Sequence, residues 1–210
     1  MSIMVEKKTL GKVSTNCYFV YNDDTKEALI VDPAADGAYI KSILEEKGLT
    51  LVAVLLTHGH FDHIMAAQYL KDNYHIPIMA HELEKEVLEN ANINLSGSMG
   101  GGGIELKADQ FLQDGDILKL LGTKITVIYT PGHTIGGVCY LFEEEKMLFS
   151  GDTLFKDTVG RTDFPTGNMS TLIKSIKDKL SILSDNVIVY PGHEEETSIG
   201  RERKFNPYIS

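Results

Sequence analysis

A continuous run of six apolar residues at positions 51–56 constrains this chain more than any other feature. A run of this length is typical of a strand that is buried on both faces. Thr-His-Gly-His-Phe-Asp-His follows directly at positions 57–63, and a helical pattern then runs from Ile64 to about Asn73. The histidines therefore lie in a turn at the carboxyl end of a buried strand. Open α/β sheets place their ligand sites outside such strand ends.

The turn carries four strong metal ligands within six positions: His58, His60, Asp62 and His63. Neutral imidazoles crowded here would have little to bind, and protonated imidazoles would repel one another. Divalent cations remove this conflict because imidazole and carboxylate groups both ligate them. The turn therefore predicts a metal site, in which Gly59 allows a tight bend and leaves room for a close neighbour.

Length and composition narrow the class of protein. The 210 residues suit one domain, so we expect residues 1–210 to form a single domain of ordinary globular composition. No stretch is apolar for long enough to cross a bilayer, and the first eight residues lack the layout of a signal peptide. We expect a cytoplasmic protein without a membrane partner. The net charge of −10 does not favour a nucleic-acid partner, which leaves a small-molecule substrate as the expected partner and the oligomeric state open.

The two cysteines, Cys17 and Cys139, both lie in apolar, strand-like runs. A lone buried cysteine is usually a small core residue, and the sequence offers neither thiol an obvious activating base. We interpret both as structural residues and predict no disulfide bond.

Strand and helix patterns alternate in two similar stretches of the chain, about 15–90 and 115–195. The first predicts strands at 15–21, 27–32, 51–56 and 76–80, and helices at 36–47, 64–73 and 81–90. The second predicts strands at 117–120, 123–130, 138–142, 146–150 and 186–190, and a helix at 169–183 before a polar tail. This order indicates two αβ halves, each with helices on the outer face of a sheet.

Residues 91–103 end in four consecutive glycines, which cannot hold a rigid loop on their own. The spacing does not match a phosphate-binding loop, and no Lys-Ser or Lys-Thr pair follows. We expect a flexible surface excursion near 97–103 in preference to a phosphate cradle. A lid over the site is a further alternative.

Three later strands end as the first one does, with a glycine and then a residue that can bind a metal. Each of these residues alone would be interpreted as an ordinary polar loop residue. All of them, however, follow the carboxyl end of a strand, as the histidine turn does. Seven ligands suit two metals that share a bridging carboxylate. The remaining two histidines, His75 and His81, lack this context and are interpreted as structural or solvated. The candidate metal ligands are His58, His60, Asp62, His63, His133, Asp152 and His193.

The order of these ligands resembles the metallo-β-lactamase superfamily, and the resemblance extends from Asp32 to Pro207. Residues 160–165 (Gly-Arg-Thr-Asp-Phe-Pro) and 200–207 (Gly-Arg-Glu-Arg-Lys-Phe-Asn-Pro) resemble the glyoxalase II-like, or hydroxyacylglutathione hydrolase-like, branch. That branch includes the persulfide dioxygenases. The resemblance implies an α/β fold, a four-layer αββα sandwich with the metals at one edge of its two sheets. It also implies that one metal is held by His58, His60 and His133, the other by Asp62, His63 and His193, and that Asp152 bridges them.

Two further residues gain candidate roles from the resemblance. Asp32 resembles an aspartate that orients the histidine turn, although it could equally be a turn former before Pro33. Arg161 is a candidate substrate-binding residue, and a structural ion pair with Asp163 is the favoured alternative. The ligand set suits two divalent ions, zinc above all, and also iron or manganese.

The expected reaction is hydrolysis of a thioester by a hydroxide that bridges the metals, with Asp62 as a possible proton acceptor. The alternatives are a persulfide dioxygenase with one iron and a non-catalytic metal-binding scaffold domain. Classical glyoxalase II has a further helical domain that binds glutathione and usually a histidine where Gly59 stands here. S-lactoylglutathione is therefore the less favoured substrate.

Overall fold

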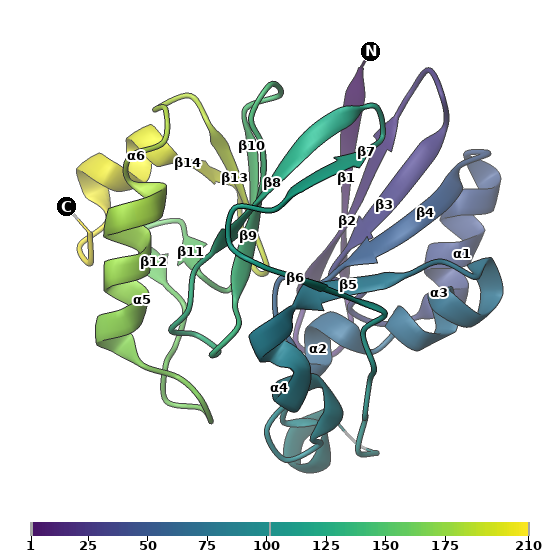
Figure 1. Cartoon of the computed structure of the whole chain (residues 1–210), viewed down its shortest axis with the longest axis horizontal. Helices are drawn as coiled ribbons and strands as arrows, with labels where there is room; N and C mark the ends of the chain where they lie inside the picture. The colour runs from purple at the N-terminus through teal and green to yellow at the C-terminus, as the bar shows by residue number, and fades with distance from the viewer. Residues whose placement is uncertain (1, 101, 210) are drawn as a thin grey trace.

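Two six-stranded β-sheets face each other, and each carries helices on its outer surface (Figure 1). The structure is a computed structural model that describes residues 2–100 and 102–209. The first sheet has the order β1-β2-β3-β4-β5-β6 and the second the order β14-β13-β10-β9-β8-β7. The predicted four-layer αββα sandwich is therefore confirmed.

The first half contains the strands β1 (Ile3–Leu10), β2 (Thr15–Asn22), β3 (Glu27–Val31), β4 (Thr50–Leu55), β5 (Ile78–His81) and β6 (Gln110–Leu112). Strands β1 to β3 pair antiparallel, whereas β3 to β6 pair parallel. The parallel strands need crossover connections, and these place helices on the outer face of the sheet. The helical elements are α1 (Gly37–Glu46), α2 (Phe61–Ile64), α3 (Ala67–Tyr74), the 3-10 turn η1 (Glu82–Glu84), α4 (Lys85–Glu89) and the π-helical turn η2 (Ser96–Gly100).

The second half contains β7 (Ile117–Leu120), β8 (Thr123–Tyr129), β9 (Val138–Phe142), β10 (Met147–Gly151), β13 (Ile188–Pro191) and β14 (Thr197–Ser198). A small ribbon formed by β11 (Leu154–Phe155) and β12 (Thr158–Val159) follows β10. The outer helices are α5 (Met169–Ser175), which continues as the π-helical turn η3 (Ile176–Leu180), and α6 (Ile199–Phe205).

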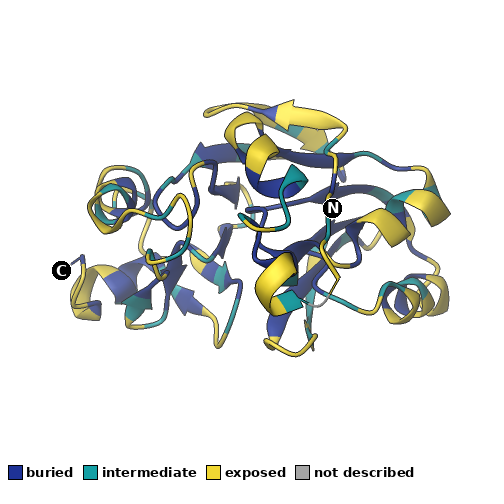
Figure 2. Cartoon of the chain, turned by 90° about the horizontal axis from the view of Figure 1, so that it is seen from below, coloured by how far each residue is buried: buried dark blue, intermediate teal, exposed yellow. Residues whose placement is uncertain are grey.

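Three separate apolar cores fill the three spaces between the four layers. Side chains alternate between faces along a strand, so neighbouring residues enter different cores. In β4, Val54 packs under α1 and α3, while Leu55 packs between the sheets. This confirms that the strand at 51–56 is buried on both faces. The third core lies between the second sheet and α5. Figure 2 shows the buried strands inside and the exposed positions mainly on outer helices and loops.

The two cysteines lie in different outer cores. Cys17 belongs to the core under α1, and Cys139 belongs to the core under α5. Both are free and buried, and burial raises the pKa of the Cys139 thiol to about 11. These positions agree with the structural role predicted for both residues.

Several elements differ from the sequence predictions. The helix expected from Ile64 to Asn73 is broken between α2 and α3, because the amide of Ala66 donates to the carbonyl of Pro33. The polar tail contains β14 and α6, and the N-terminal strand β1 was not predicted.

The residues that lead into the glycine-rich segment are packed, whereas residues 97–99 lie on the surface, where the excursion is expected. The flexibility of this segment stays a prediction. Asn94 and Ser96 are fully buried, and the Ser96 hydroxyl accepts from the amide of Ile104 at 2.7 Å. Residue 101 lies outside the described residues.

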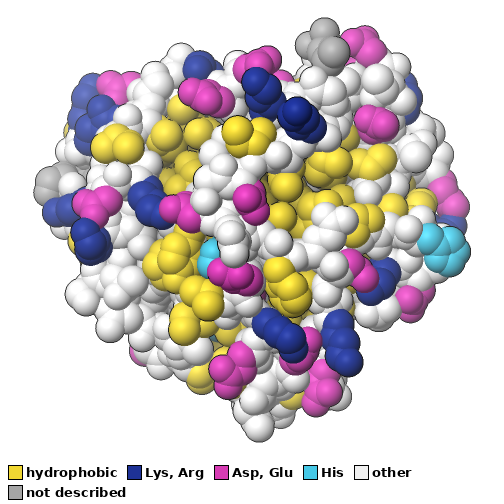
Figure 3. Space-filling view, in the orientation of Figure 1, with side chains coloured by type: hydrophobic (Ala, Val, Ile, Leu, Met, Phe, Trp, Pro, Cys, Tyr) yellow, Lys and Arg dark blue, Asp and Glu magenta, His cyan; other side chains and the backbone are white. Residues whose placement is uncertain are grey.

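None of the helices in residues 2–100 and 102–209 combines the length and apolar character needed to cross a bilayer. On the face drawn in Figure 3, apolar side chains gather along the middle, and charged side chains are spread around them.

The core between the sheets should dominate stability. Phe149 is 1% exposed and contacts the rings of Tyr18, Phe142 and Tyr190. We expect Phe149→Ala to lower the free energy of unfolding by about 3–5 kcal/mol, because it removes buried area and leaves a cavity. Urea unfolding measures this. The matched control is Ile182→Ala, at a 75% exposed position, with an expected change of about 0.5 kcal/mol or less. Equal losses of unfolding free energy in both variants would contradict the dominant role of the core between the sheets.

Candidate metal centre

All seven candidate ligands meet at one edge of the sandwich, at the carboxyl ends of four strands. The turn after β4 supplies four of them, and the loops after β8, β10 and β13 supply one each. Ligand atoms lie within 4.8 Å of one another in His58, His60 and His133, and again in Asp62, His63 and His193. Asp32, His58 and His63 form a third such group, which shares one histidine with each of the other two. The division into the two groups that the resemblance implies stays a prediction.

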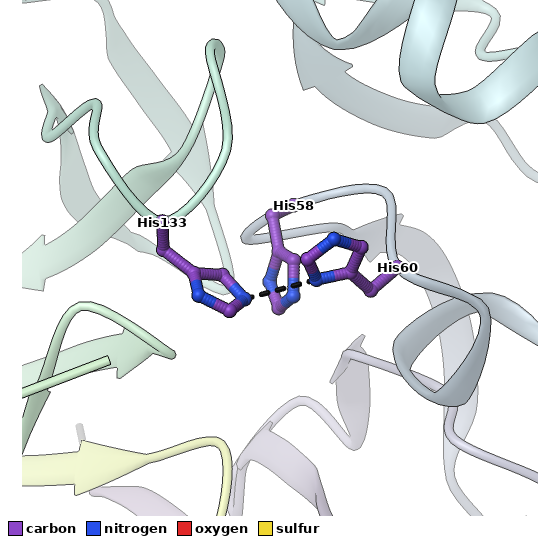
Figure 4. Close-up of side chains that lie close together, drawn as sticks. All are labelled: His58, His60 and His133. Carbon is purple, nitrogen blue, oxygen red and sulfur yellow. Dashed lines mark hydrogen bonds between the residues drawn. The ribbon is translucent and has the colours of Figure 1, made fainter. Parts of the chain in front are cut away.

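The first group joins the two halves of the protein. Figure 4 shows the rings of His58 and His60, from the turn after β4, facing the ring of His133 from the loop after β8. His60 Nδ1 lies 2.9 Å from His133 Nε2, a hydrogen bond that a bound ion would replace. All three residues are buried.

Hydrogen bonds to the other ring nitrogens orient these imidazoles. His133 Nδ1 lies 2.7 Å from the carbonyl oxygen of Arg161, so it must donate and Nε2 keeps its lone pair. Thr57 Oγ1 donates to Asp32 at 2.6 Å, so His58 Nδ1, at 3.1 Å, donates to Thr57 and leaves its Nε2 free. Both rings therefore present a lone pair to the centre, as metal ligands do.

Several buried polar atoms converge at this edge without a hydrogen-bond partner among the described residues: His58 Nε2, His60 Nε2, His63 Nε2 and Asp152 Oδ1. Leaving such atoms unpaired is costly, and native proteins seldom do so. A metal ion would satisfy His58 Nε2, His63 Nε2 and Asp152 Oδ1, so these residues fit a metal centre.

The spacing in the second group also fits a metal. Asp62 Oδ2 lies 3.4 Å from His63 Nε2 and 3.3 Å from His193 Nε2. These separations exceed good hydrogen bonds. They match the distance of about 3.3–3.4 Å between ligand atoms that surround a tetrahedral zinc ion at about 2.0–2.1 Å.

Asp152 lies between the two groups. Its Oδ1 is 3.4 Å from His63 Nε2, and its Oδ2 is 3.5 Å from His133 Nε2. Its Oδ2 also lies 3.6 Å from His193 Nε2, so the carboxylate of Asp152 lies beside ligands of both groups. Gly192 makes this approach possible, since a Cβ atom there would lie 2.3 Å from Asp152 Oδ1.

The two groups differ in electrostatic character. Burial, followed by the neighbouring imidazoles, lowers the pKa of His58 and His60 well below its usual range, so both rings are neutral ligands. Burial also acts to lower the pKa of His63, but Asp62, Asp152 and Asp32 outweigh it and raise that pKa to about 10. The second group is therefore rich in carboxylates that favour a positive charge at its centre.

Asp32 is hydrogen-bonded to residues of the histidine turn. It is 2% exposed, accepts from the Thr57 amide at 2.8 Å and lies 2.9 Å from His63 Nδ1. Of the two readings of Asp32, these contacts favour the one in which it orients the turn.

We expect Asp32→Asn to weaken metal binding by about 10- to 100-fold, because the carboxylate that orients His63 is lost. Competition with a chromophoric chelator measures this. Asp36→Asn is a matched control, because Asp36 has the same left-handed backbone (φ 52° against 51°) and caps α1 outside the centre. Unchanged metal affinity in Asp32→Asn would rule out a role for Asp32 in orienting His63.

Sequence reasoning missed Glu84, which looks like one of several surface acids in a polar helix. It is 1% exposed, and its Oε2 accepts from the amide of Gly59 at 2.8 Å. Its Oε1 accepts from the Gly136 amide at 2.7 Å and from the Thr134 hydroxyl. Burial raises its pKa to about 7, while these three donors act in the opposite direction. Glu84 therefore ties the turn of the first half to the His133 loop of the second, and it occupies the room beside Gly59.

Glu84→Gln should weaken this tie, since an amide group accepts on one side only. We expect a loss of about 1–3 kcal/mol in unfolding free energy and weaker metal binding. Urea unfolding with chelator and metal titration measure the two effects. Glu86→Gln, at an exposed position two residues away, is the control. If both variants behave alike, the tie has no energetic importance.

The remaining candidates have other contacts. The Arg161 side chain makes two 2.7 Å hydrogen bonds to Asp163 and lies 3.8 Å from the Phe164 ring centroid. These contacts favour the ion-pair alternative, and its substrate-binding role stays a prediction. His75 ends α3 in a left-handed conformation, and His81 stacks on Tyr129, so the centre contains neither.

The fold and this histidine–aspartate centre define a metal-dependent hydrolase class of αββα proteins. The chain belongs to the metallo-beta-lactamase superfamily, whose family model matches residues 10–193. This confirms the resemblance found in the sequence.

Similar proteins cover nearly the whole chain. The chain is 38% identical to the "Probable metallo-hydrolase YqgX" of Bacillus subtilis over 96% of this chain and 95% of that protein. It is 38% identical to the "Hydroxyacylglutathione hydrolase GloC" of Haemophilus influenzae over 93% and 92%, respectively.

Solved structures with a similar fold also cover nearly the whole chain. The BLEG-1 B3 metallo-beta-lactamase superposes with a TM-score of 0.93, 39% identity and coverage of 99% of this chain and 100% of that one. TTHA1623, solved in a di-iron-bound form, gives a TM-score of 0.86 and 31% identity over 97% and 100%.

Proposed function

We propose that this protein is a binuclear metal hydrolase that cleaves thioesters of small-molecule substrates. The observation that carries the proposal is the pair of ligand groups with Asp152 between them. The similarity to a hydroxyacylglutathione hydrolase supports the thioester as the bond that is cleaved.

The residues have separate roles in this proposal. His58, His60 and His133 would hold one ion, Asp62, His63 and His193 the other, and Asp152 would contact both. Divalent ions in these positions supply an activated water and a Lewis acid for the thioester carbonyl. A thiolate leaves without a strong general acid, so none has to be found in the site.

Asp62 is the residue that we propose accepts a proton during the reaction. Its Oδ2 accepts a 2.6 Å hydrogen bond from Thr15 Oγ1, which fixes the carboxylate beside His193. Burial acts to raise the pKa of Asp62, but His63 and His193 outweigh it and hold that pKa below its usual range when no cation is bound, so the carboxylate is ionised.

Zinc is the proposed metal, because imidazole and carboxylate ligands with tetrahedral spacing suit it. The test is to strip the chain with chelator and refill it with zinc, manganese or, without oxygen, iron(II). Metal content is then measured together with hydrolysis of a thioester panel. We expect two metals per chain and turnover that depends on both.

Oxygen uptake with glutathione persulfide is measured on the same samples. One iron per chain and stoichiometric oxygen consumption would favour the dioxygenase alternative and contradict the proposal. Metal binding without turnover of any thioester would point to a scaffold domain.

His193→Ala should remove one ion and leave the other. We expect the metal content to fall from two ions to one and kcat/KM for a thioester to fall at least about a hundredfold, because the second group loses a ligand. His75→Asn is the matched control, because Asn tolerates the left-handed conformation of this histidine outside the centre. Full turnover in His193→Ala would exclude two-metal catalysis.

A further inference from the structure

A cavity of about 340 Å³ opens directly beside the metal centre. Its polar floor includes His60, Asp62, His133, Asp152 and His193. The volume is near the lower end of the range of about 300–1,000 Å³ for small-molecule pockets. The cavity therefore has room for a short group on either side of a bond held at the metals.

One wall of the cavity comes from the first half, and it is firmly held. Phe61, Leu95 and Met99 form it. The Phe61 amide donates to the carbonyl of Asn94 at 2.9 Å, which binds the glycine-rich segment to the metal turn. Gly100 lies so close to Phe61 that a Cβ atom there would be 2.7 Å from the ring. The glycine-rich segment thus builds a wall beside the metals.

The opposite wall is also apolar. Phe155 and Val159 from the small β11–β12 ribbon line it, together with Phe164. Phe155 and Val159 are 9% and 8% exposed, so they belong to the packed structure and do not project freely. His60 lies edge-on to Phe164 at a centroid distance of 5.8 Å, which continues this wall to the metal ligands.

Apart from the proposed metals, the side chains that line the cavity offer little to an anionic substrate group. Arg161 is the one lysine or arginine among the lining residues that the structure describes, and both hydrogen bonds of its fork go to Asp163. Glu194 adds a negative charge to the lining. The two carboxylates of a glutathione arm would therefore find no uncommitted cation in this lining.

We propose that the substrate is a thioester with apolar, uncharged groups on both sides of the scissile bond, and that its thiol is not glutathione. This inference rests on the proposed function and deepens it. The apolar walls would bind such groups by removing their surface from water, while a charged arm would lose hydration without a partner.

The test compares two thioesters with the same butanoyl group, one formed with N-acetylcysteamine and one with glutathione. The zinc-loaded chain of residues 1–210 is used. They differ only in the thiol, so the ratio of their kcat/KM values measures the effect of the whole glutathione arm, and the variants below separate its charge from its size. We expect the neutral thioester to be preferred at least about tenfold. S-lactoylglutathione is measured alongside them.

Two variants locate the preference in the cavity. Met99→Lys places a cation on the exposed wall and should reduce the preference several-fold, whereas Ile182→Lys, at a 75% exposed position outside the lining, should not. Asp163→Asn removes the carboxylate that pairs with the Arg161 guanidinium. It should therefore raise kcat/KM for the glutathione thioester alone.

The outcomes separate the two proposals. Equal or better turnover of the glutathione thioesters overturns this inference and leaves the hydrolase proposal in place. A neutral preference that Met99→Lys and Asp163→Asn leave unchanged also overturns it, because the cavity would not be its cause. Turnover of no thioester by the metal-loaded chain overturns both.

Discussion

The packing of the two sheets against each other is the constraint on which the metal centre depends. Four strand ends from two halves of the chain must reach one edge within a few ångströms. The aromatic core that includes Tyr18, Tyr140 and Phe149 fixes the distance between the sheets. Tyr140 also donates to the carbonyl of Leu56, just before the metal turn, at 2.8 Å. The core thus sets the position of the ligands as well as the stability of the fold.

The centre itself works against stability when no cation is bound. Neutral rings of His58 and His60 are buried with nitrogen atoms that have no partner among the described residues, and carboxylates lie close together beside them. Proteins hold such arrangements only where the surrounding structure determines them. Asp32 and Glu84 do this from opposite sides: one supports the turn from the first sheet, and the other ties it to the second half.

The sequence predicts the fold and the location of the centre well, because both rest on local patterns. A buried strand that runs into His58 and His60 needs no long-range information to be read, and the same holds for the strand–glycine–ligand motifs. Glu84 could not be predicted in this way, since its burial depends on a loop more than 50 positions away in sequence. The packing of the residues before the glycines could not be predicted for a similar reason: Asn94 and Ser96 bond to the backbone of Ile104, and composition does not reveal these contacts.

Phe61 belongs both to the segment that carries the metal ligands and to the wall of the cavity. It stands between His60, a member of the first ligand group, and Asp62, a member of the second, while its ring forms part of the cavity wall. A substrate group that presses on this ring acts on the segment that carries both sets of ligands. If occupancy of the cavity alters metal binding through this segment, thermodynamic reciprocity requires that metal binding alters occupancy of the cavity to the same degree. Metal affinity in this protein would depend on which substrate is present.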